Sequence, residues 1–282
     1  MDPRGKKILR AIALVIALAL VSGVLLFANA LVGNPISRAL AKRSAEAYLE
    51  ENFPNADHFI QEIDYNFKDM DYYARVGSPS SADSAFTIAL TMSGKYKYDN
   101  YQQCVAGRQN TLRRLDDAYR ARCRSILEGQ GFPYRGSMTT GFGTISDAAF
   151  FAEQDPPEPG TPMNTFDISA LELDGVYPID ELGEKYGRLC LYIESDDPTA
   201  EKAAEILLTT KALMEAGEAP FFTIDLSLSP VRSKEGRDMA GEGLEILNFP
   251  WSAIYEEGLA ERVQVAADET EAHYAQMDAQ EK

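Results

Sequence analysis

The sequence predicts an α+β protein: an N-terminal transmembrane helix followed by two small α+β domains with largely antiparallel sheets. Three observations predict this architecture. Ala11 to Val32 form a run of 22 residues without a charged side chain. After this run, stretches that alternate apolar and polar residues are interleaved with stretches of helical periodicity. The charge balance also changes, because residues 33–128 carry 13 Lys/Arg and 13 Asp/Glu whereas residues 129–282 carry 10 and 30.

The uncharged run is long enough to cross a membrane. As a helix, its 22 residues span roughly 33 Å, and the hydrocarbon core of a bilayer is about 30 Å thick. Only a helix satisfies its backbone hydrogen bonds there. Four basic residues and one acidic residue precede the run, and basic flanks stay in the cytoplasm. We therefore expect a single-pass protein of the cell membrane, anchored through Ala11–Val32, with a cytoplasmic N-terminus and extracellular domains.

Ala28-Asn29-Ala30 offers an alternative to the anchor, because small-x-small sequences are cleaved by signal peptidase. The apolar core Ala11–Phe27 already has 17 residues, which exceeds the roughly 7–15 residues usual in a signal peptide. We therefore expect the anchor to be retained. Cleavage after Ala30 would instead produce a secreted protein, and either outcome exports the rest of the chain.

Composition divides the chain into four segments. The longest stretch rich in glycine and proline has six Gly and five Pro within residues 129–165, which is typical of a linker. The expected segments are a basic flank with a transmembrane signal-anchor over 1–32, an N-terminal α+β domain over 33–128, the linker over 129–165, and an acidic C-terminal α+β domain with a helical tail over 166–282.

The first domain is expected to contain a helix, three or four antiparallel strands and a second helix. Asn34 can cap a helix whose first residue is Pro35. Residues 62–67 alternate apolar and polar side chains, as do residues 86–92, and turn signals between such stretches favour hairpins. A long helix over 101–128, weakly interrupted by a glycine, closes the domain.

The second domain is expected to alternate strands and helices. Its clearest strand is residues 221–229, where apolar residues recur at every second position. The expected elements, in order, are a short strand at Leu171–Leu173, a helix at Ile179–Tyr186, a strand at 188–194, a helix from Asp197-Pro198 to Gly217, a strand at 221–229, its hairpin partner at 244–249 and a helical tail that begins at Pro250-Trp251.

Tyrosines are concentrated in the first predicted sheet and at its end. Two interpretations stay open: ordinary β-propensity with a buried face, or a recognition face, since tyrosine is enriched at protein interfaces. The residues of this candidate interaction surface are Tyr65, Tyr72, Tyr73, Tyr96 and Tyr98.

No motif indicates a catalytic residue, a cofactor site or a metal site. His58 and His273 have no neighbours that suggest a triad or a metal site, and we expect both at the surface. Cysteines form no Cys-x-x-Cys pair, so we interpret them as small hydrophobic residues. The cysteines are Cys104, Cys123 and Cys190. The carboxylates on which a hydrolase could draw include Asp64, Glu194, Asp197 and Asp225.

The excess of carboxylates limits the classes of molecule that the chain can bind. A net charge of −20 over residues 129–282 (10 basic, 30 acidic) repels nucleic acid. The acids keep an exported domain soluble, or they bind cations or a basic partner. We expect a non-catalytic module that binds a protein or peptide at the cell surface through the tyrosine-rich sheet or its edge. The alternatives are calcium-dependent binding or sensing by the acidic domain, and a carboxylate-based hydrolase.

Three stretches carry a resemblance to a known family. They are GNPISRALAKRSAEAYLEENFP at 33–54, IDYNFKDMDYYARV at 63–76 and RLDDAYRARCRSIL at 114–127. Together they resemble the YfjL-like proteins, which are membrane-anchored bacterial proteins of uncharacterised function. The resemblance covers the anchor and residues 33–128. It implies the anchor and the division into two domains, and it supplies no catalytic residue.

Overall fold

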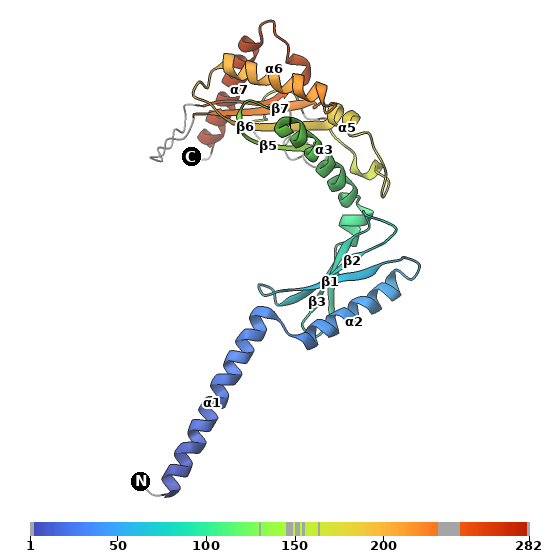
Figure 1. The fold of residues 1–282 in the computed structure, drawn as a ribbon, viewed down its shortest axis with the longest axis vertical. Helices are drawn as coiled ribbons and strands as arrows, with labels where there is room; N and C mark the ends of the chain where they lie inside the picture. The colour runs from blue at the N-terminus through green and yellow to red at the C-terminus, as the bar shows by residue number, and fades with distance from the viewer. Residues whose placement is uncertain are drawn as a thin grey trace. The chain divides into compact units, whose positions relative to one another are not determined.

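The computed structural model describes residues 3–129, 131–144, 149, 153, 156–162, 164–230 and 243–280. The chain forms two compact units, Met1–Asn110 and Thr111–Lys282. Each unit contains one four-stranded sheet, with strand orders β1-β2-β3-β4 and β5-β6-β7-β8. Figure 1 follows both units along the chain from blue to red.

The first helix, α1 (Pro3–Val32), contains the uncharged run. Within the described residues, its most apolar window of 18 residues has a mean hydropathy of 2.5, and none of that window is buried. By length and composition, α1 is therefore able to cross a membrane, as the sequence predicts.

The second helix, α2 (Pro35–Asn52), begins where the sequence predicts it. The Asn34 side chain accepts a hydrogen bond of 2.7 Å from the backbone N–H of Ser37, and Pro35 lies at the first helical position, where no hydrogen bond is lost. Ala41 and Ala45 are completely buried. These small side chains allow α2 to lie close against the sheet.

The first sheet is an antiparallel meander, as expected from its hairpin signals. Its strands are β1 (Phe59–Asn66), β2 (Asp71–Gly77), β3 (Phe86–Thr91) and β4 (Tyr96–Asp99), each paired with the next. Its apolar face packs on α2 and buries Ile63, Ala74, Val76, Ile88 and Leu90.

The long helix expected at 101–128 is divided, which corrects the predicted domain boundary. A π-helical turn, η1 (Gln102–Ala106), is followed by Gly107, by Arg108 at φ +61° and then by α3 (Gln109–Gly129). A residue with positive φ cannot continue a right-handed helix. The apolar side of α3 belongs to the core of the second sheet, with Leu115, Tyr119 and Cys123 buried there. The units therefore divide after Asn110 rather than after residue 128.

The second sheet corrects two further expectations. Its strands are β5 (Arg135–Phe142), β6 (Gly187–Glu194), β7 (Thr223–Ser229) and β8 (Leu244–Pro250). The predicted linker 129–165 thus contains an edge strand, β5, although residues 130, 145–148, 150–152, 154–155 and 163 lie outside the described part. The β6–β7 pair is parallel, because α6 crosses over between the two strands. The other two pairs are antiparallel.

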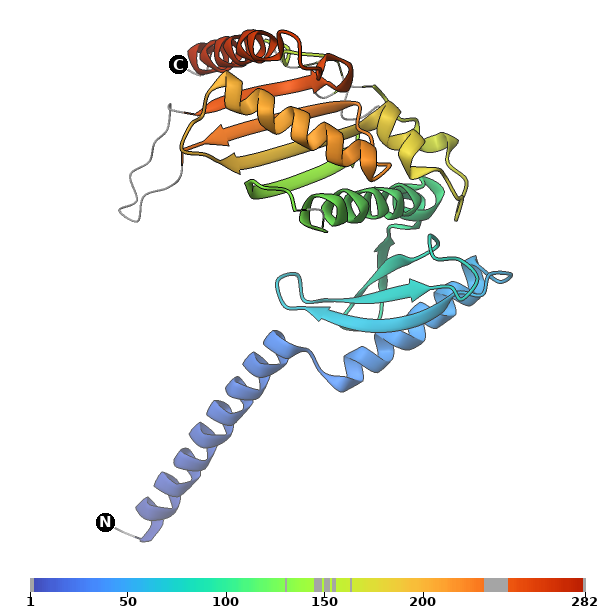
Figure 2. The same cartoon turned by 45° about the horizontal axis from the view of Figure 1, so that its top comes forward.

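Within the described part of the second unit, three helices accompany the sheet besides α3. They are α5 (Ile179–Tyr186), α6 (Ala200–Ala216) and α7 (Leu259–Gln280). Figure 2 shows α6 across one face of the sheet, α3 beside the β5 edge and α7 beside the β8 edge. Helix α6 has Thr199 as its N-cap and therefore begins slightly later than the start expected at Asp197-Pro198. The short strand expected at Leu171–Leu173 is absent from this described stretch, where a 3-10 turn, η2 (Ile168–Ala170), ends at Leu171. The C-terminal tail begins with a second 3-10 turn, η3 (Trp251–Ala253), which precedes α7.

Candidate functional site

The five tyrosines of the predicted surface lie on two different faces of the first sheet. Tyr65 pairs with Tyr72, Tyr72 with Leu90, and Leu90 with Tyr96 across neighbouring strands. Directly paired residues share a face, so Tyr65, Tyr72 and Tyr96 lie on the side of α2. The pairs Tyr73–Ala89 and Ala89–Tyr98 occupy the opposite side. The predicted surface is therefore not continuous.

Tyr65 and Tyr72 hold the junction between α1 and α2. The Tyr65 hydroxyl donates a hydrogen bond of 2.8 Å to the carbonyl of Ala30. The Tyr72 hydroxyl accepts from the backbone N–H of Asn34 at 2.9 Å and donates to the Asn34 carbonyl at 3.0 Å. Only 1% of Tyr72 is exposed. Tyr72 is thus a buried anchor, and its assignment to an interaction surface was wrong.

Gly33 makes this junction possible. Its φ is +71°, and a Cβ at this position would lie 2.5 Å from the Tyr72 hydroxyl oxygen and 2.9 Å from Tyr65 Cγ. Glycine adopts positive φ without a steric penalty. The chain therefore turns from α1 into α2 at a residue that tolerates no side chain, directly beneath the two tyrosines.

Tyr73 and Tyr98 lie together on the face that α2 does not cover. Their hydroxyl oxygens are 3.5 Å apart, and the Tyr73 hydroxyl donates to Asp69 Oδ2 at 2.5 Å. The hydrogen bond to the Asp69 carboxylate raises the pKa of Tyr73, so this hydroxyl stays protonated. Half of Tyr98, 51%, is exposed. Tyr73 and Tyr98 are therefore the part of the predicted surface that lies on the face of the sheet opposite α2.

Tyr96 has a separate environment near the end of α2. Its ring stacks on Tyr48, with centroids 4.7 Å apart. Both hydroxyls donate to Asp99 Oδ2, at 2.9 Å from Tyr96 and 2.5 Å from Tyr48. Burial and the Asp99 hydrogen bond raise the pKa of Tyr48. Tyr96 therefore joins α2 to β4 and lies apart from Tyr73 and Tyr98.

In the second unit, a polar cluster that the sequence did not predict is centred on Arg188. Its Nε donates to Asp225 Oδ2 at 2.6 Å, and one terminal nitrogen lies 3.7 Å from Glu158 Oε2. Asn248 donates its backbone N–H to Asp225 Oδ1 at 2.7 Å and its side-chain amide to Glu158 at 2.9 Å. Less than a fifth of each charged side chain is exposed. This network ties the segment around Glu158 to β6, β7 and β8.

Cys190 lies beside this cluster, with its Sγ 3.1 Å from Asp225 Oδ2. Burial, together with the neighbouring Asp225 carboxylate, raises the pKa of the Cys190 thiol to about 12. Burial also raises the pKa of Cys123 to about 12. Since the thiolate is the nucleophilic form, neither thiol is activated at neutral pH. All three cysteines, including Cys104, are free.

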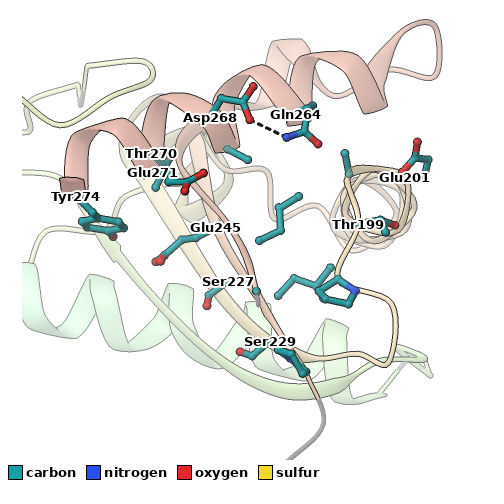
Figure 3. Close-up of a pocket in the computed structure, with 17 residues that line it drawn as sticks. Thr199, Glu201, Ser227, Ser229, Glu245, Gln264, Asp268, Thr270, Glu271 and Tyr274 are labelled. Atoms are coloured by element: carbon teal, nitrogen blue, oxygen red, sulfur yellow. Dashed lines mark hydrogen bonds between the residues drawn. The ribbon is translucent and has the colours of Figure 1, made fainter. Parts of the chain in front are cut away.

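An acidic pocket of about 780 Å³ opens between α6, α7 and the β7–β8 strands. Figure 3 shows polar side chains from these elements around it, including Ser227, Glu245 and Tyr274. The lining carboxylates are Glu201, Glu245, Asp268 and Glu271. Burial raises the pKa of Glu245, which also forms a hydrogen bond with Tyr274. Within the described residues, no three His, Cys, Asp or Glu side chains are grouped closely enough to hold a metal ion. Residues 231–242, which connect β7 to β8, are outside that part.

Three of the four carboxylates considered for a hydrolase, Asp64, Asp225 and Glu194, are engaged with arginines. Asp64 belongs to the first unit and binds Arg75 at 2.8 Å. Asp225 is paired with Arg188, whereas Glu194 lies 3.7 Å from Arg135. Asp225 lies opposite Cys190 on the neighbouring strand β6. Glu194 follows Cys190 by four residues on β6, which separates Glu194 from Asp225 by roughly 13 Å along the strand direction. This separation exceeds the distances that two-carboxylate hydrolysis uses.

Both histidines depart from the expectation of a surface position. His58 is half-buried in an aromatic cluster, with ring centroids 5.3 Å from Phe53 and 5.4 Å from Phe86. Burial lowers its pKa. His273 is only 5% exposed, on the buried side of α7. Each histidine packs as an aromatic ring, a role that short sequence neighbourhoods do not reveal.

Among the comparisons with known proteins, only a family model supports a family resemblance, and it covers the first unit alone. The family model described as YfjL-like, N-terminal domain, matches residues 7–100. This match confirms the resemblance over α1, α2 and the first sheet. A crystal structure of a DUF5037 family protein from Ruminococcus gnavus ATCC 29149 is similar at 10% identity and a TM-score of 0.21, over 66% of this chain and 73% of that chain. No curated protein matches the chain.

Proposed function

We propose that this protein is a membrane-anchored, extracytoplasmic module that binds a protein or peptide at the cell surface without catalysis. The observation that carries the proposal is the uncovered face of the first sheet, where Tyr73 and Tyr98 lie together. Beside them, Arg75 bridges Glu62 at 3.6 Å and Asp64 at 2.8 Å. Aromatic side chains surrounded by charged groups are typical of a protein interface with a central anchor and a polar rim.

The anchor is proposed to be retained because the folded unit uses residues on both sides of Ala30. Tyr65 binds the Ala30 carbonyl, and Tyr72 binds Asn34. Cleavage after Ala30 would release the Tyr65 hydroxyl from its partner. The family match also begins within α1, at residue 7. The basic residues before the apolar run favour a cytoplasmic N-terminus.

The absence of catalysis is proposed on chemical grounds. Asp225, which is closest to a thiol, is committed to Arg188 at 2.6 Å. The neighbouring thiol of Cys190 is protonated at neutral pH. An activated nucleophile needs a base within hydrogen-bond reach and a pKa suited to its task. The polar cluster of the second unit is therefore assigned a structural role.

The anchor is tested by the N-terminus of the protein purified from native membranes. Retention predicts a chain that still contains α1, read by N-terminal sequencing or intact mass. A chain that starts at Leu31 would show cleavage and would overturn the anchor. Protease added outside intact cells should also digest the outer units. Full protection would overturn their extracytoplasmic position.

Binding by the first sheet is tested by photocrosslinking in native membranes. Tyr98 and Tyr192 are each 51% exposed, but they belong to different sheets, so they form a matched pair. Each is replaced by p-benzoylphenylalanine in the full chain. The proposal predicts a discrete crosslinked species from position 98 that is lost in Tyr73→Ala and is absent from position 192. Identical products from both positions, or none from position 98, would count against it.

A second candidate, calcium-dependent binding, draws on the net charge of −20 over residues 129–282 (10 basic, 30 acidic), although the carboxylates of the described residues form no metal-binding cluster. Its test is the thermal unfolding of the full chain with and without millimolar calcium. A site filled at 100 times its dissociation constant adds about 2.7 kcal/mol of stability. An unchanged transition would remove this candidate. A shift that survives Glu245→Gln together with Asp268→Asn would place calcium elsewhere.

A further inference from the structure

Strand β5 is one of the two edge strands of the second sheet, and its backbone groups point alternately toward β6 and away from it. In an antiparallel strand, the N–H and C=O of one residue point to the same side. The Phe142 N–H is bound by Asp116 of α3 at 3.0 Å, so Phe142 points away from β6. By the same alternation, Gly136, Met138 and Thr140 also point away from it.

Helix α3 occupies only one end of this edge. Asp116 accepts from Phe142, and an Arg120 terminal nitrogen lies 3.4 Å from the Thr140 carbonyl oxygen. Thr140 is buried at this end, whereas Gly136 is exposed at the other. Among the described residues, no hydrogen bond occupies the outward backbone groups of Gly136 and Met138. The first half of β5 is therefore an open strand edge.

A pocket of about 450 Å³ lies beside this open half. It is bounded by the last turns of α3, by the residues that precede β5, and by Gly136–Met138. Its apolar lining residues are Leu127, Phe132, Met138, Leu191 and Ile193. Leu191 and Ile193 are almost fully buried and form its floor. Figure 2 shows β5 and α3 side by side along this border.

The arginines around the pocket favour a ligand with negative charge. Residues 129–282 carry 30 acidic and 10 basic side chains, but the open end of β5 has Arg135, and the pocket wall has Arg124. Each has one exposed acidic neighbour, with Arg135 3.7 Å from Glu194 and Arg124 3.8 Å from Glu128. Exposed pairs of this kind are weak, so both guanidinium groups can exchange partners with an incoming carboxylate.

We propose that an extended peptide adds as a fifth strand to β5 at Gly136–Met138, in the groove between β5 and α3. Its backbone pairs with the open groups of Gly136 and Met138. One apolar side chain enters the pocket, and acidic side chains meet Arg124 and Arg135. Strand addition takes affinity from main-chain hydrogen bonds and specificity from pockets for alternate side chains. The inference rests on the proposed binding function and names a second surface and the class of its ligand.

The test uses the full chain in lipid nanodiscs and a phage library of random eight-residue linear peptides, which matches the eight residues of β5. Selected peptides are synthesised, and their affinity is measured by fluorescence polarisation. Each backbone amide of the best peptide is then N-methylated in turn. Strand addition predicts that methylation at every second position weakens binding by about tenfold or more. Methylation at the positions between should have little effect.

A pair of variants checks the same contact from the side of the protein. Met138→Pro removes an N–H that points away from β6, which an edge strand tolerates, and should abolish binding. Met138→Leu keeps both the N–H and the apolar side chain and should bind like the wild type. The methylation scan decides the question even if Met138→Pro does not fold, because it changes only the peptide.

Two results would overturn the inference. One is failure to select any peptide, and the other is a methylation profile without a period of two. Neither result touches crosslinking from position 98, which tests the proposed function separately. Conversely, an alternating profile together with loss of binding in Met138→Pro supports strand addition even if position 98 gives no product.

Discussion

The two sheets have the same number of strands but are assembled differently. In the first sheet, every strand pairs with the next in sequence. In the second, β5 pairs with a strand that begins 45 residues after β5 ends (187 minus 142), and β6 pairs in parallel with β7 across α6. Local pairings can be recognised from turn signals, whereas distant pairings depend on the packing of the whole unit.

The sheets also differ in how they hold polar side chains. The first sheet uses tyrosine hydroxyls of Tyr65 and Tyr72 to bind backbone groups at the helix junction. The second uses the charged pair Arg188–Asp225, extended by Glu158. A lost hydroxyl leaves neutral groups unsatisfied, whereas loss of the Asp225 carboxylate removes the nearest charged partner of a largely buried guanidinium. We therefore expect larger losses of stability from changes in the second sheet.

The largest effect is expected from Asp225→Ala. This change leaves Arg188, with only 17% of its side chain exposed, beside the more distant Glu158, and it frees the Asn248 N–H. We expect the free energy of unfolding of the second unit to fall by about 3 kcal/mol. Trp251 is the single tryptophan and packs on Phe221 in this unit, so its fluorescence follows the relevant transition in urea.

The control for this prediction is Glu194→Gln in the same sheet. Its carboxylate lies 3.7 Å from Arg135, of which 89% is exposed, so the loss should stay below about 0.5 kcal/mol. Equal losses in the free energy of unfolding would show that the Arg188–Asp225 pair stabilises the unit no more than a surface pair does. The expected difference in stability between the two sheets would then be wrong.

A smaller loss is expected from Gly33→Ala at the α1–α2 junction. A left-handed conformation costs a residue with a Cβ about 1–2 kcal/mol, and this Cβ would also lie 2.5 Å from the Tyr72 hydroxyl oxygen. Hydrogen exchange over residues 30–38 should accelerate, while the Trp251 transition should stay in place. Gly23→Ala is the control, because a Cβ at Gly23 would have no atom within 4 Å. Unchanged exchange in Gly33→Ala would contradict the proposed packing of the junction.

Local signals were sufficient for most of the first unit. The Asn34 cap, the Pro35 start of α2 and the alternating strand β1 all follow from residues close together in sequence. The faces of the tyrosines could not be assigned in this way, because the β3–β4 pairing shifts register between Ala89 and Leu90. That irregularity places Tyr96 on the side of α2 and Tyr98 on the opposite side, although residues two positions apart in a regular strand share a face.

In the second unit, the strands β6, β7 and β8 and the β7–β8 hairpin were predicted, whereas β5, the parallel β6–β7 pair and the polar cluster were not. Arg188 and Asp225 occupy the polar positions of two alternating strands, which is a visible signal. Their contact depends on the parallel register that places Arg188 opposite Thr223 and Cys190 opposite Asp225. The Gly/Pro-rich composition that predicted a linker also hid β5, since its sequence contains two glycines and two threonines, residues shared by strands and loops.

Tyr72→Phe should reduce the free energy of unfolding by less than Asp225→Ala or Gly33→Ala. It removes one hydroxyl that serves both the N–H and the C=O of Asn34, and we expect a loss of about 1–2 kcal/mol from the first unit. Exchange of the Asn34 amide, measured by mass spectrometry, is the direct readout. Tyr98→Phe removes an exposed hydroxyl 3.5 Å from Tyr73 and should leave that amide unaffected. Equal protection of the Asn34 amide in both variants would disprove the anchoring role of Tyr72.

The smallest effect concerns Glu245 and depends on pH. Burial raises the pKa of Glu245 in the folded chain, so the folded state holds this proton more tightly than the unfolded state. Stability from this group is therefore present below the ordinary carboxyl pKa and is lost as pH rises through the raised value. Glu245→Gln imitates the protonated acid and can keep a hydrogen bond to Tyr274. Because the side chain is partly exposed, the gain at pH 7 should stay below about 1 kcal/mol, with none near pH 4. Glu271→Gln removes an exposed carboxylate from the same pocket and controls for net charge. Trp251 transitions measured from pH 4 to 8 should diverge for Glu245→Gln and the wild type, and parallel curves would refute this assignment.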